Sequence, residues 1–403
     1  MRNSSTVSES KRTDGSSDRV NRRKVLAATA GLSATALAGC VGGGPSQGGE
    51  EGNATDETTE GSQGSGDATT TSGEYPDYSG NTLTVATWAG IYAEAFEKSV
   101  ARMFEERTGA NVEVAPAGGS ILTEIQSAPE DNPPYDIAAA EGFFYWQGRN
   151  ENLFQEIDTS KISNLDNVYS YLKDLRGTKY GVPTDGSLEG IVYNTNVGWE
   201  PTTWTDLLSD KQGTDRIGFE GAWYIYPMEV AAVSLDNKTG IQELYDEQSH
   251  QAVLDRLREF GQNVELWTGS FAEIETSLKQ GIINFSMWYS GMGNAAASQQ
   301  EQLGFVTPDK TAGYLDHYCP VRGSEKTQMA HDFLNHMIDP AVQSEWAKTG
   351  YVFTTNKEAT YPEQTKSQYP SSNSEWKQVS IADFTKLSEY SSMFSSKFQE
   401  IKG

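Results

Sequence analysis

Aromatic side chains gather just after two predicted strands of this sequence. Phe143 and Phe144 follow one apolar run, 135–140, and Trp223 and Tyr224 follow a second predicted strand, 216–219. Open sheets bind ligands at the carboxyl ends of their strands, and the face of an aromatic ring attracts a cation by roughly 0.5 to 2 kcal/mol. These positions predict a binding site whose aromatic walls suit a small organic cation.

The elements that must position these rings are those of an α/β fold. A strand at 83–87, a helix at 93–108 and a strand at 112–114 follow one another with short joints, the pattern of a right-handed crossover in a parallel sheet. Further strands are predicted at 191–193 and 282–286. Single cores stop growing near 250 to 300 residues, so we expect the chain after residue 80 to divide into two lobes.

The first forty residues have the pattern of an export signal. Arg22 and Arg23 precede an apolar run, as in a twin-arginine signal. That run, 25–38, would rise roughly 21 Å as a helix, short of the ~30 Å hydrocarbon core, so it suits a cleaved signal better than a membrane span. Small residues then lead to Cys40, which we expect to become the lipidated N-terminus of the mature protein.

Residues 41–78 are predicted to form a disordered tether. They consist mainly of Gly, Ser, Thr, Glu and Asp, with almost no aliphatic side chain that could build a core. A lipid at one end and a folded unit at the other would hold the protein at the extracellular face of the cell membrane while leaving it free to diffuse.

The formal charge of −25 restricts the partners and the medium. Binding to a nucleic-acid backbone needs clustered Lys and Arg, so nucleic acid is excluded. Self-repulsion opposes folding unless salt screens it, and at about 1 M salt the Debye length falls to roughly 3 Å. The composition is similar to that of proteins from salt-loving archaea, so we expect a salty medium.

Signatures of catalysis and of metal binding are missing from the sequence. We find no nucleophile elbow, phosphate loop, zinc spacing or convincing acid pair, and no internal repeat. The four histidines show no metal-ligand spacing, and Cys319 has no partner once Cys40 carries a lipid, so we expect Cys319 to be a small buried hydrophobe. We therefore predict no enzyme, no metal and no cofactor.

A series of short motifs runs along residues 81–358. In chain order it comprises Trp88 with Tyr92, FEERTG at 104–109, YDI at 135–137, GVP at 181–183, YNT at 193–195, TWTDL at 203–207, MWYSG at 287–291 and AVQ through GY at 341–351. Taken in this order, the series resembles the extracellular solute-binding proteins of ATP-driven (ABC) importers, most closely the group that includes the spermidine/putrescine receptors.

The resemblance implies a two-lobed α/β fold, periplasmic-binding-protein-like (type II), with a hinge between lobes that close over a small organic solute. We assign 79–191 plus 289–338 to the first lobe and 192–288 plus 339–403 to the second. A cognate ABC permease and ATPase are the implied partners, and we expect a monomer.

The resemblance also implies site residues. By position, Trp88, Tyr92 and Trp288 match aromatic ligand contacts of the polyamine receptors, and we include Ser290 from the motif at 287–291. The rings that follow the strands, Phe143, Phe144, Trp223 and Tyr224, complete the predicted aromatic lining.

One departure leaves the ligand open. Polyamine receptors carry two acidic residues just after the second-lobe strand, where this chain has 221–224 with Glu220 as the nearby carboxylate. Glu141 and Asp316 fall at predicted cleft edges and can take their place. A polyamine-like cation is the expected solute, with thiamine, another amine or ferric iron as alternatives. An extracellular cleft enzyme and a structural surface protein are the alternatives from other classes.

Overall fold

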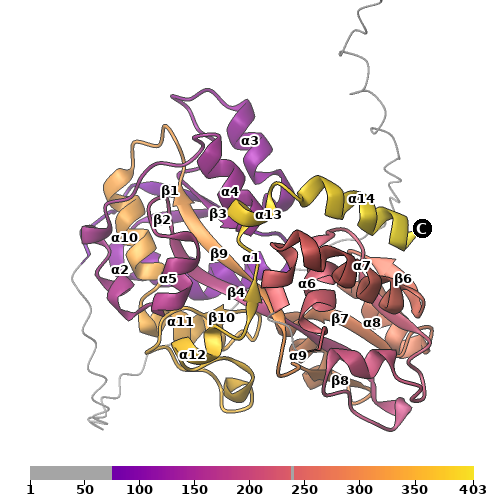
Figure 1. Cartoon of the computed structure of the whole chain (residues 1–403). Coiled ribbons are helices and arrows are strands. Elements are labelled where there is room, and N and C mark those ends of the chain that lie inside the picture. Colours follow the sequence, from indigo (N-terminus) through magenta and orange to yellow (C-terminus); the bar gives the residue numbers. More distant parts are fainter. Residues whose placement is uncertain (1–74, 237–239) are drawn as a thin grey trace, which may run out of the picture. The chain divides into compact units, whose positions relative to one another are not determined.

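A computed structural model describes residues 75–236 and 240–403 of the chain (Figure 1). The export signal predicted at 1–40, the lipid site at Cys40 and nearly all of the predicted tether lie outside these residues. Of the predicted tether only the last four residues are described, and two of them pack on the folded unit. The rings of Tyr75 and Tyr78 lie 6.2 and 6.3 Å from that of Phe104. The folded part therefore begins slightly earlier than predicted.

A mixed sheet runs through both lobes in the strand order β2-β1-β3-β9-β4-β7-β5-β6. Three further short strands, β8, β10 and β11, pair with β4 or β9. The strands are β1 Thr82–Ala86, β2 Asn111–Ala115, β3 Ile137–Glu141, β4 Val182–Asn194, β5 Ile217–Glu220, β6 Val264–Thr268, β7 Phe285–Tyr289, β8 Leu303–Val306, β9 Ala312–Pro320, β10 Phe353–Thr354 and β11 Ser380–Ile381.

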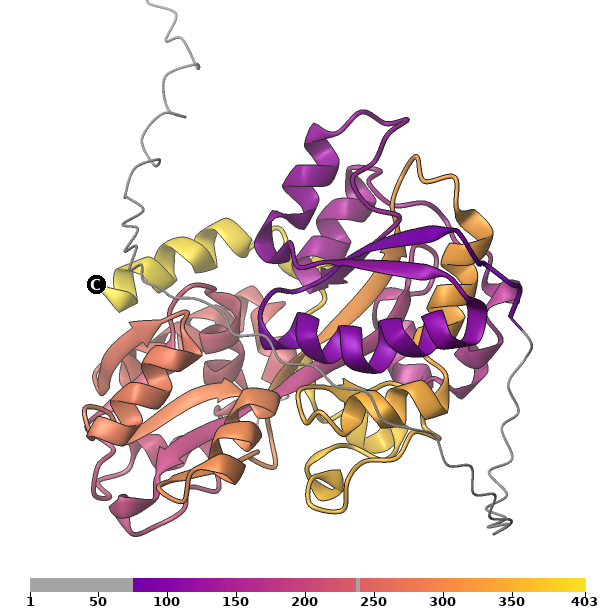
Figure 2. The same cartoon turned by 180° about the vertical axis from the view of Figure 1, so that it is seen from behind.

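Helices cover this sheet in each lobe. The predicted helix at 93–108 is a continuous helical segment with a π-helical stretch, Glu97–Ala101, and Figure 2 shows it lying across one face of the first-lobe sheet. The α-helices are α1 Ile91–Phe96, α2 Arg102–Thr108, α3 Ile121–Ser127, α4 Gly142–Asn150, α5 Ser170–Arg176, α6 Ile225–Val233, α7 Glu247–Gly261, α8 Phe271–Gln280, α9 Ser290–Gln299, α10 Thr327–Met337, α11 Pro340–Ala347, α12 Asn373–Trp376, α13 Phe384–Leu387 and α14 Ser391–Lys402.

Strand β4 connects the two lobes. Its first half pairs with β9, and its second half pairs with β7 and β8. All 13 of its residues are buried, so it lies in the interior of the molecule. Neighbouring strands approach it so closely that a Cβ at Gly186 would lie 2.0 Å from the carbonyl oxygen of Tyr314. Residues on β4 therefore sit where the two lobes meet.

Two large hydrophobic cores correspond to the two lobes. The first contains Val85, Phe104 and Phe333 of β1, α2 and α10, and the second contains Phe219 and Phe260 of β5 and α7. Parallel pairing of β1 with β2 and β3, and of β5 with β6 and β7, is the pattern of crossover units that the sequence predicted. The predicted α/β architecture is confirmed.

The C-terminal residues do not follow a single lobe. Of residues 339–403, predicted for the second lobe, Trp346 lies in the first core, Trp376 in a third cluster with Leu172, and Phe398 in the second core. Likewise α9 and β8, which fall within 289–338, pack with the second-lobe part of β4. Helix periodicity shows which face is apolar but not which core receives it, so the pattern could not assign these helices.

Cys319 is fully buried and unpaired within the described residues, as predicted. In the same part of the chain, we find no helix with the length and apolar character that a membrane span requires.

Candidate functional site

A cavity of about 480 Å³ opens where the two lobes meet. It is lined from the first lobe by side chains at the ends of β1 and β3, and from the second lobe by the segment after β5 and by α14. Its lining residues are Trp88, Gly119, Glu141, Phe143, Phe144, Ala222, Trp223, Tyr224, Ile225, Tyr226, Tyr289, Tyr314, Phe384, Ser391, Ser395 and Gln399.

Strand ends place the aromatic rings around this cavity. Strand β3 leads directly into α4, which puts Phe144 in the first helical turn, edge-on to Trp88 with ring centroids 5.4 Å apart. Trp223 of the second lobe comes within 6.2 Å of Phe144 and remains 45% exposed at the rim of the cavity. On the other side, the Tyr289 ring meets Tyr314 edge-on at 5.4 Å. Both lobes therefore contribute π faces to one space.

Three carboxyl groups form a row across adjacent strands beside these rings. Glu141 on β3 is in register with Asp316 on β9, and Asp316 is in register with Asp185 on β4. Asp185 and Asp316 are fully buried. Like charges directly opposite each other on neighbouring strands repel. We call these three residues the carboxylate row.

Hydrogen bonds satisfy the carboxylate row only in part. Trp88 donates from Nε1 to Asp316 Oδ2 at 2.8 Å, and the Tyr92 hydroxyl donates to Asp185 Oδ2 at 2.8 Å. Asp316 Oδ1 is buried without a partner among the described residues. Burial raises the pKa of Asp185 to about 7, and burial together with the charge of Asp185 raises that of Asp316. Burial also raises the pKa of Glu141.

A second acidic group lies deeper, on the second-lobe side. Glu189 of β4 has neither carboxylate oxygen paired within the described part of the chain, and Glu229 of α6 has one unpaired oxygen there. Burial raises the pKa of both groups and that of Glu220, whose charge adds to the shift of Glu189. The interior between the lobes is therefore rich in carboxyl groups.

Few cations balance these acids. Arg176 of α5 lies with Nη2 3.7 Å from Glu141 Oε1, and the same nitrogen donates to the carbonyl oxygen of Ala382 at 2.9 Å. The charge of Lys402 also lowers the pKa of Glu220, against the larger effect of burial. Within the described ranges no group of three or more His, Cys, Asp or Glu side chains could hold a metal ion. Carboxylates beside aromatic rings suit an organic cation.

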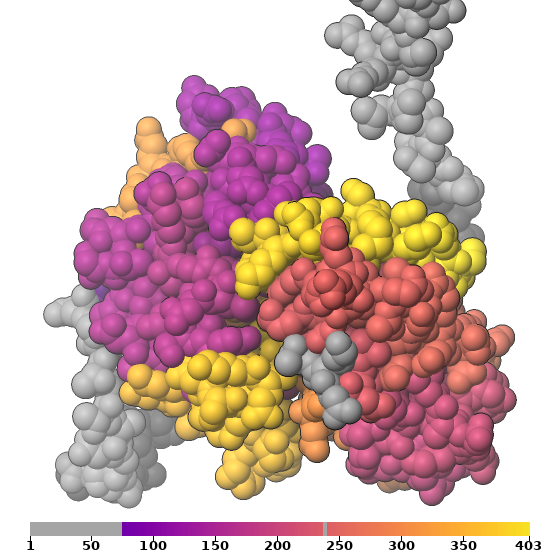
Figure 3. Space-filling view, in the orientation of Figure 1, coloured from indigo at the N-terminus to yellow at the C-terminus, as the bar shows by residue number. Residues whose placement is uncertain are grey.

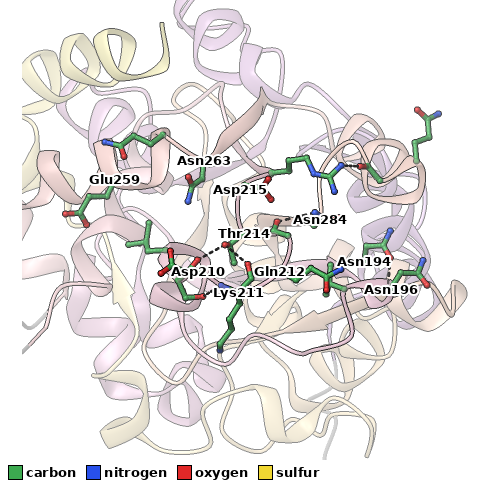
Figure 4. A pocket seen from close by; sticks show the side chains of 18 of the residues that line it. Asn194, Asn196, Asp210, Lys211, Gln212, Thr214, Asp215, Glu259, Asn263 and Asn284 are labelled. Atoms are coloured by element: carbon green, nitrogen blue, oxygen red, sulfur yellow. Dashed lines mark hydrogen bonds between the residues drawn. The ribbon is translucent and has the colours of Figure 1, made fainter.

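A larger and more open pocket, about 1050 Å³, lies on the second lobe (Figure 4). Amide and charged side chains line it, including Asn263 and Asn284, which directly precede β6 and β7. Its cations are already engaged: Arg216 donates to the Gly281 carbonyl at 2.6 Å, and Lys279 pairs with Glu275 at 2.8 Å. None of the side chains lining it carries a buried polar atom without a partner. The cavity between the lobes is therefore the stronger candidate.

Sequence comparison identifies the family of the chain. Residues 99–371 match the family described as bacterial extracellular solute-binding protein. The chain belongs to this family. Family membership also confirms that it is a binding protein and not an enzyme. A search of curated proteins found no match.

Solved structures of other solute-binding proteins share the fold. The spermidine/putrescine ABC transporter substrate-binding protein PotD from Streptococcus pneumoniae is 22% identical, with a TM-score of 0.65 over 80% of this chain and 100% of that one. The TpPotD lipoprotein of Treponema pallidum is 17% identical, with a TM-score of 0.64 over 80% and 99%. AgtB from A. tumefaciens R10, in complex with agropinic acid, is 17% identical, with a TM-score of 0.62 over 81% and 99%. The predicted periplasmic-binding-protein type of fold is thereby confirmed.

The structure of this solute-binding protein brings together six of the ten predicted site residues. Those that line the cavity are Trp88, Glu141, Phe143, Phe144, Trp223 and Tyr224. Tyr92 and Asp316 do not line it. Asp316 lies directly behind the lining, where it accepts the Trp88 hydrogen bond, and Tyr92 is bonded to Asp185, the neighbour of Asp316 on β4. Their contribution to a site is through the residues that they contact.

Trp288 and Ser290 do not line this cavity. Trp288 is 3% exposed in a separate apolar cluster, where its ring packs 5.6 Å from Phe271. Side chains alternate between the faces of a strand, so its neighbour on β7, Tyr289, points to the cavity instead. Ser290 begins α9, fully buried, with its hydroxyl 3.0 Å from that of Ser187.

Several lining residues were missed. Tyr289 and Tyr226 stand within one or two residues of the predicted positions Trp288 and Tyr224. Tyr314, Phe384 and the α14 residues come from late segments whose partners the sequence does not reveal. The deeper acids Glu189 and Glu229 were missed because they lie in otherwise apolar stretches.

Proposed function

We propose that this protein captures a small, polyamine-like organic cation in the cavity between its lobes and delivers it to an ABC permease driven by an ATPase. The carboxylate row beside the aromatic lining carries the proposal. Glu141, Asp316 and Asp185 lie in register on neighbouring strands, with one oxygen of Asp316 buried and unpaired among the described residues. A cation supplies the charge that this arrangement lacks.

Aromatic rings would add to the binding of such a cation. An ammonium group over the face of Trp88, Tyr289 or Tyr314 gains roughly 0.5 to 2 kcal/mol for each ring, more when water is expelled. Hydrogen bonds from an ammonium group to carboxylates contribute roughly 1.5 to 3 kcal/mol each. Together these contributions are sufficient for micromolar binding after the entropic cost of association.

The family of this receptor and its first forty residues support a proposal for its cellular setting. Similar structures are described as components of ABC transporters, and one as a lipoprotein, which supports a cognate permease and ATPase. We infer export through the twin-arginine signal, a lipid on Cys40 and a monomeric receptor held at the extracellular face of the cell membrane. Mass spectrometry of the membrane-extracted protein tests the lipid at Cys40.

A thermal-shift screen tests the solute. The full chain is measured in high-salt buffer with putrescine, spermidine, thiamine, betaine, amino acids, ferric citrate and sugars. A ligand at 100 times its dissociation constant adds about 2.7 kcal/mol of stability, a shift of several degrees. A shift with amines that Trp88→Ala abolishes supports the proposal. Shifts confined to iron, sugars or anions would retain the receptor and reject the cation.

A further inference from the structure

The C-terminal helix α14 presents a regular polar face to the solute cavity. Ser391, Ser395 and Gln399 are spaced by four residues, which places them on one side of the helix, and all three line the cavity. The other lining side chains are mostly aromatic. These three contribute two aliphatic hydroxyls and a carboxamide to that lining.

The adjacent, apolar face of α14 holds the helix in the second lobe. Phe394 and Phe398 are fully buried in the second core, with the Phe398 ring 5.5 Å from that of Trp267. Lys402, at the end of the helix, donates from Nζ to the carbonyl oxygen of Gly221 at 2.9 Å. Because Gly221 directly follows β5, this bond joins the helix to the segment that carries Trp223. These contacts hold α14 in the second lobe, where it forms one side of the solute cavity.

The position of α14 at the lobe boundary is visible in both cartoon views. Its first turn lies next to the first lobe, and the helix runs from there over the second lobe (Figures 1 and 2). In the space-filling view these C-terminal residues form a band along the upper edge of the second lobe (Figure 3). Just before it, Phe384 of α13 packs against Phe143 of the first lobe at 5.6 Å.

We propose that the polar face of α14 selects among organic cations, by contacting a second polar group of the solute while Glu141, the residue of the carboxylate row that lines the cavity, binds its ammonium group. The inference rests on the cation site proposed above. Small serine side chains leave room in the cavity. The Ser391 hydroxyl donates to the carbonyl oxygen of Leu387 at 3.1 Å, so it can accept a hydrogen bond from an amino or hydroxyl group of the solute, and the Ser395 hydroxyl can donate or accept one. The preferred solutes are therefore amines that carry a further amino or hydroxyl group, in preference to simple alkylamines.

The test compares three amines of equal chain length by calorimetry: putrescine, 4-amino-1-butanol and butylamine. The variant is Ser391→Ala with Ser395→Ala, and its control is Ser392→Ala with Ser396→Ala on the exposed side of the same helix. Alanine favours helices, so both variants should fold. Loss of a hydrogen bond weakens binding roughly 2- to 10-fold. We expect this loss for putrescine and aminobutanol with the cavity-side variant, and unchanged butylamine binding.

Each outcome separates the two proposals. Equal effects of the cavity-side and exposed-side variants, or an equal loss for all three amines, would overturn the selective role of α14 while keeping the cation site. Failure of the unmodified protein to bind any of the three amines would overturn both. Weaker binding of putrescine and aminobutanol alone, seen only with the cavity-side variant, supports the selective role of α14.

Discussion

Replacing Asp316 by Asn should make the ligand-free protein more stable and a weaker receptor. The amide keeps an oxygen for the Trp88 hydrogen bond and removes the central charge of the carboxylate row. Neighbouring strand residues lie about 5 Å apart, and two like charges at that distance repel by roughly 3 kcal/mol at an effective dielectric constant of about 20. Asp316→Asn removes this repulsion from both Asp185 and Glu141.

The stability of the unmodified protein should decrease as the pH rises, and the stability of Asp316→Asn should decrease less. Burial raises the pKa of Asp185 to about 7, so the folded state binds protons that the unfolded state has already released above pH 4. Stability from this group is complete below pH 4 and is lost as pH rises toward 7, by up to about 1.4 kcal/mol per pH unit for each excess proton. The melting temperature of the unmodified protein should therefore fall between pH 5 and 8, and that of Asp316→Asn should fall less.

Asp316→Asn should weaken the binding of putrescine although it stabilises the ligand-free protein. Asp316 does not line the cavity, so Asp316→Asn removes a charge that attracts the ammonium group from behind the lining and not a direct contact. Binding at pH 8, measured by calorimetry, should therefore weaken by less than the roughly 10- to 150-fold that loss of a charged hydrogen bond costs. Glu113→Gln, an exposed carboxylate on β2, is the control and should change neither stability nor affinity. If Asp316→Asn leaves the dissociation constant unchanged, or lowers the melting temperature at pH 8 as much as at pH 5, the reasoning about the carboxylate row is refuted.

Three further predictions concern packing around the site. Trp288→Ala should lower stability by roughly 3 to 5 kcal/mol in denaturant unfolding and leave amine affinity unchanged, because the ring is buried away from the cavity; weakened binding without destabilisation would restore Trp288 to the site. Arg176→Gln should destabilise by roughly 3 to 5 kcal/mol above pH 7, since Glu141 loses its buried partner, and an unchanged unfolding midpoint would argue against that pair. Gly142→Ala should destabilise because its Cβ would lie 2.6 Å from Arg176 Nη2, whereas Gly119→Ala meets nothing within 4 Å and should be silent; equal melting temperatures would disprove the clash.

Local patterns predicted the parts of the site that depend on one segment alone. The apolar run ending at Glu141 predicted a strand, and ligands bind at the carboxyl ends of such strands, so Phe143 and Phe144 were identified from a rule about sheets. Similarly, the run before Glu220 predicted β5 and placed Trp223 at the cavity. Neither prediction required knowledge of which strands are neighbours.

Strand register and long-range pairing set the limit of the sequence analysis. Trp288 and Tyr289 are adjacent, and only the pairing of β7 with β4 decides which of them faces the cavity. The carboxylate row likewise exists because β3, β9 and β4 are neighbours, although Glu141 and Asp316 are far apart in the chain. Helix α14 shows a clear amphipathic pattern, but the pattern does not reveal that its polar face meets a cavity.

The buried acids are difficult to explain by stability alone. Replacing buried ionic groups by apolar residues of similar volume is often neutral or stabilising, so a fold shaped only for stability would not need Asp185, Glu189 and Asp316 in its interior. A bound cation reverses that disadvantage, because it attracts each carboxylate and weakens the repulsion between them. Repulsion within the carboxylate row destabilises the ligand-free protein. Because a bound cation relieves this repulsion, the cation-bound form is favoured over the ligand-free form. The same residues that lower stability above pH 7 therefore make the protein selective for positive charge.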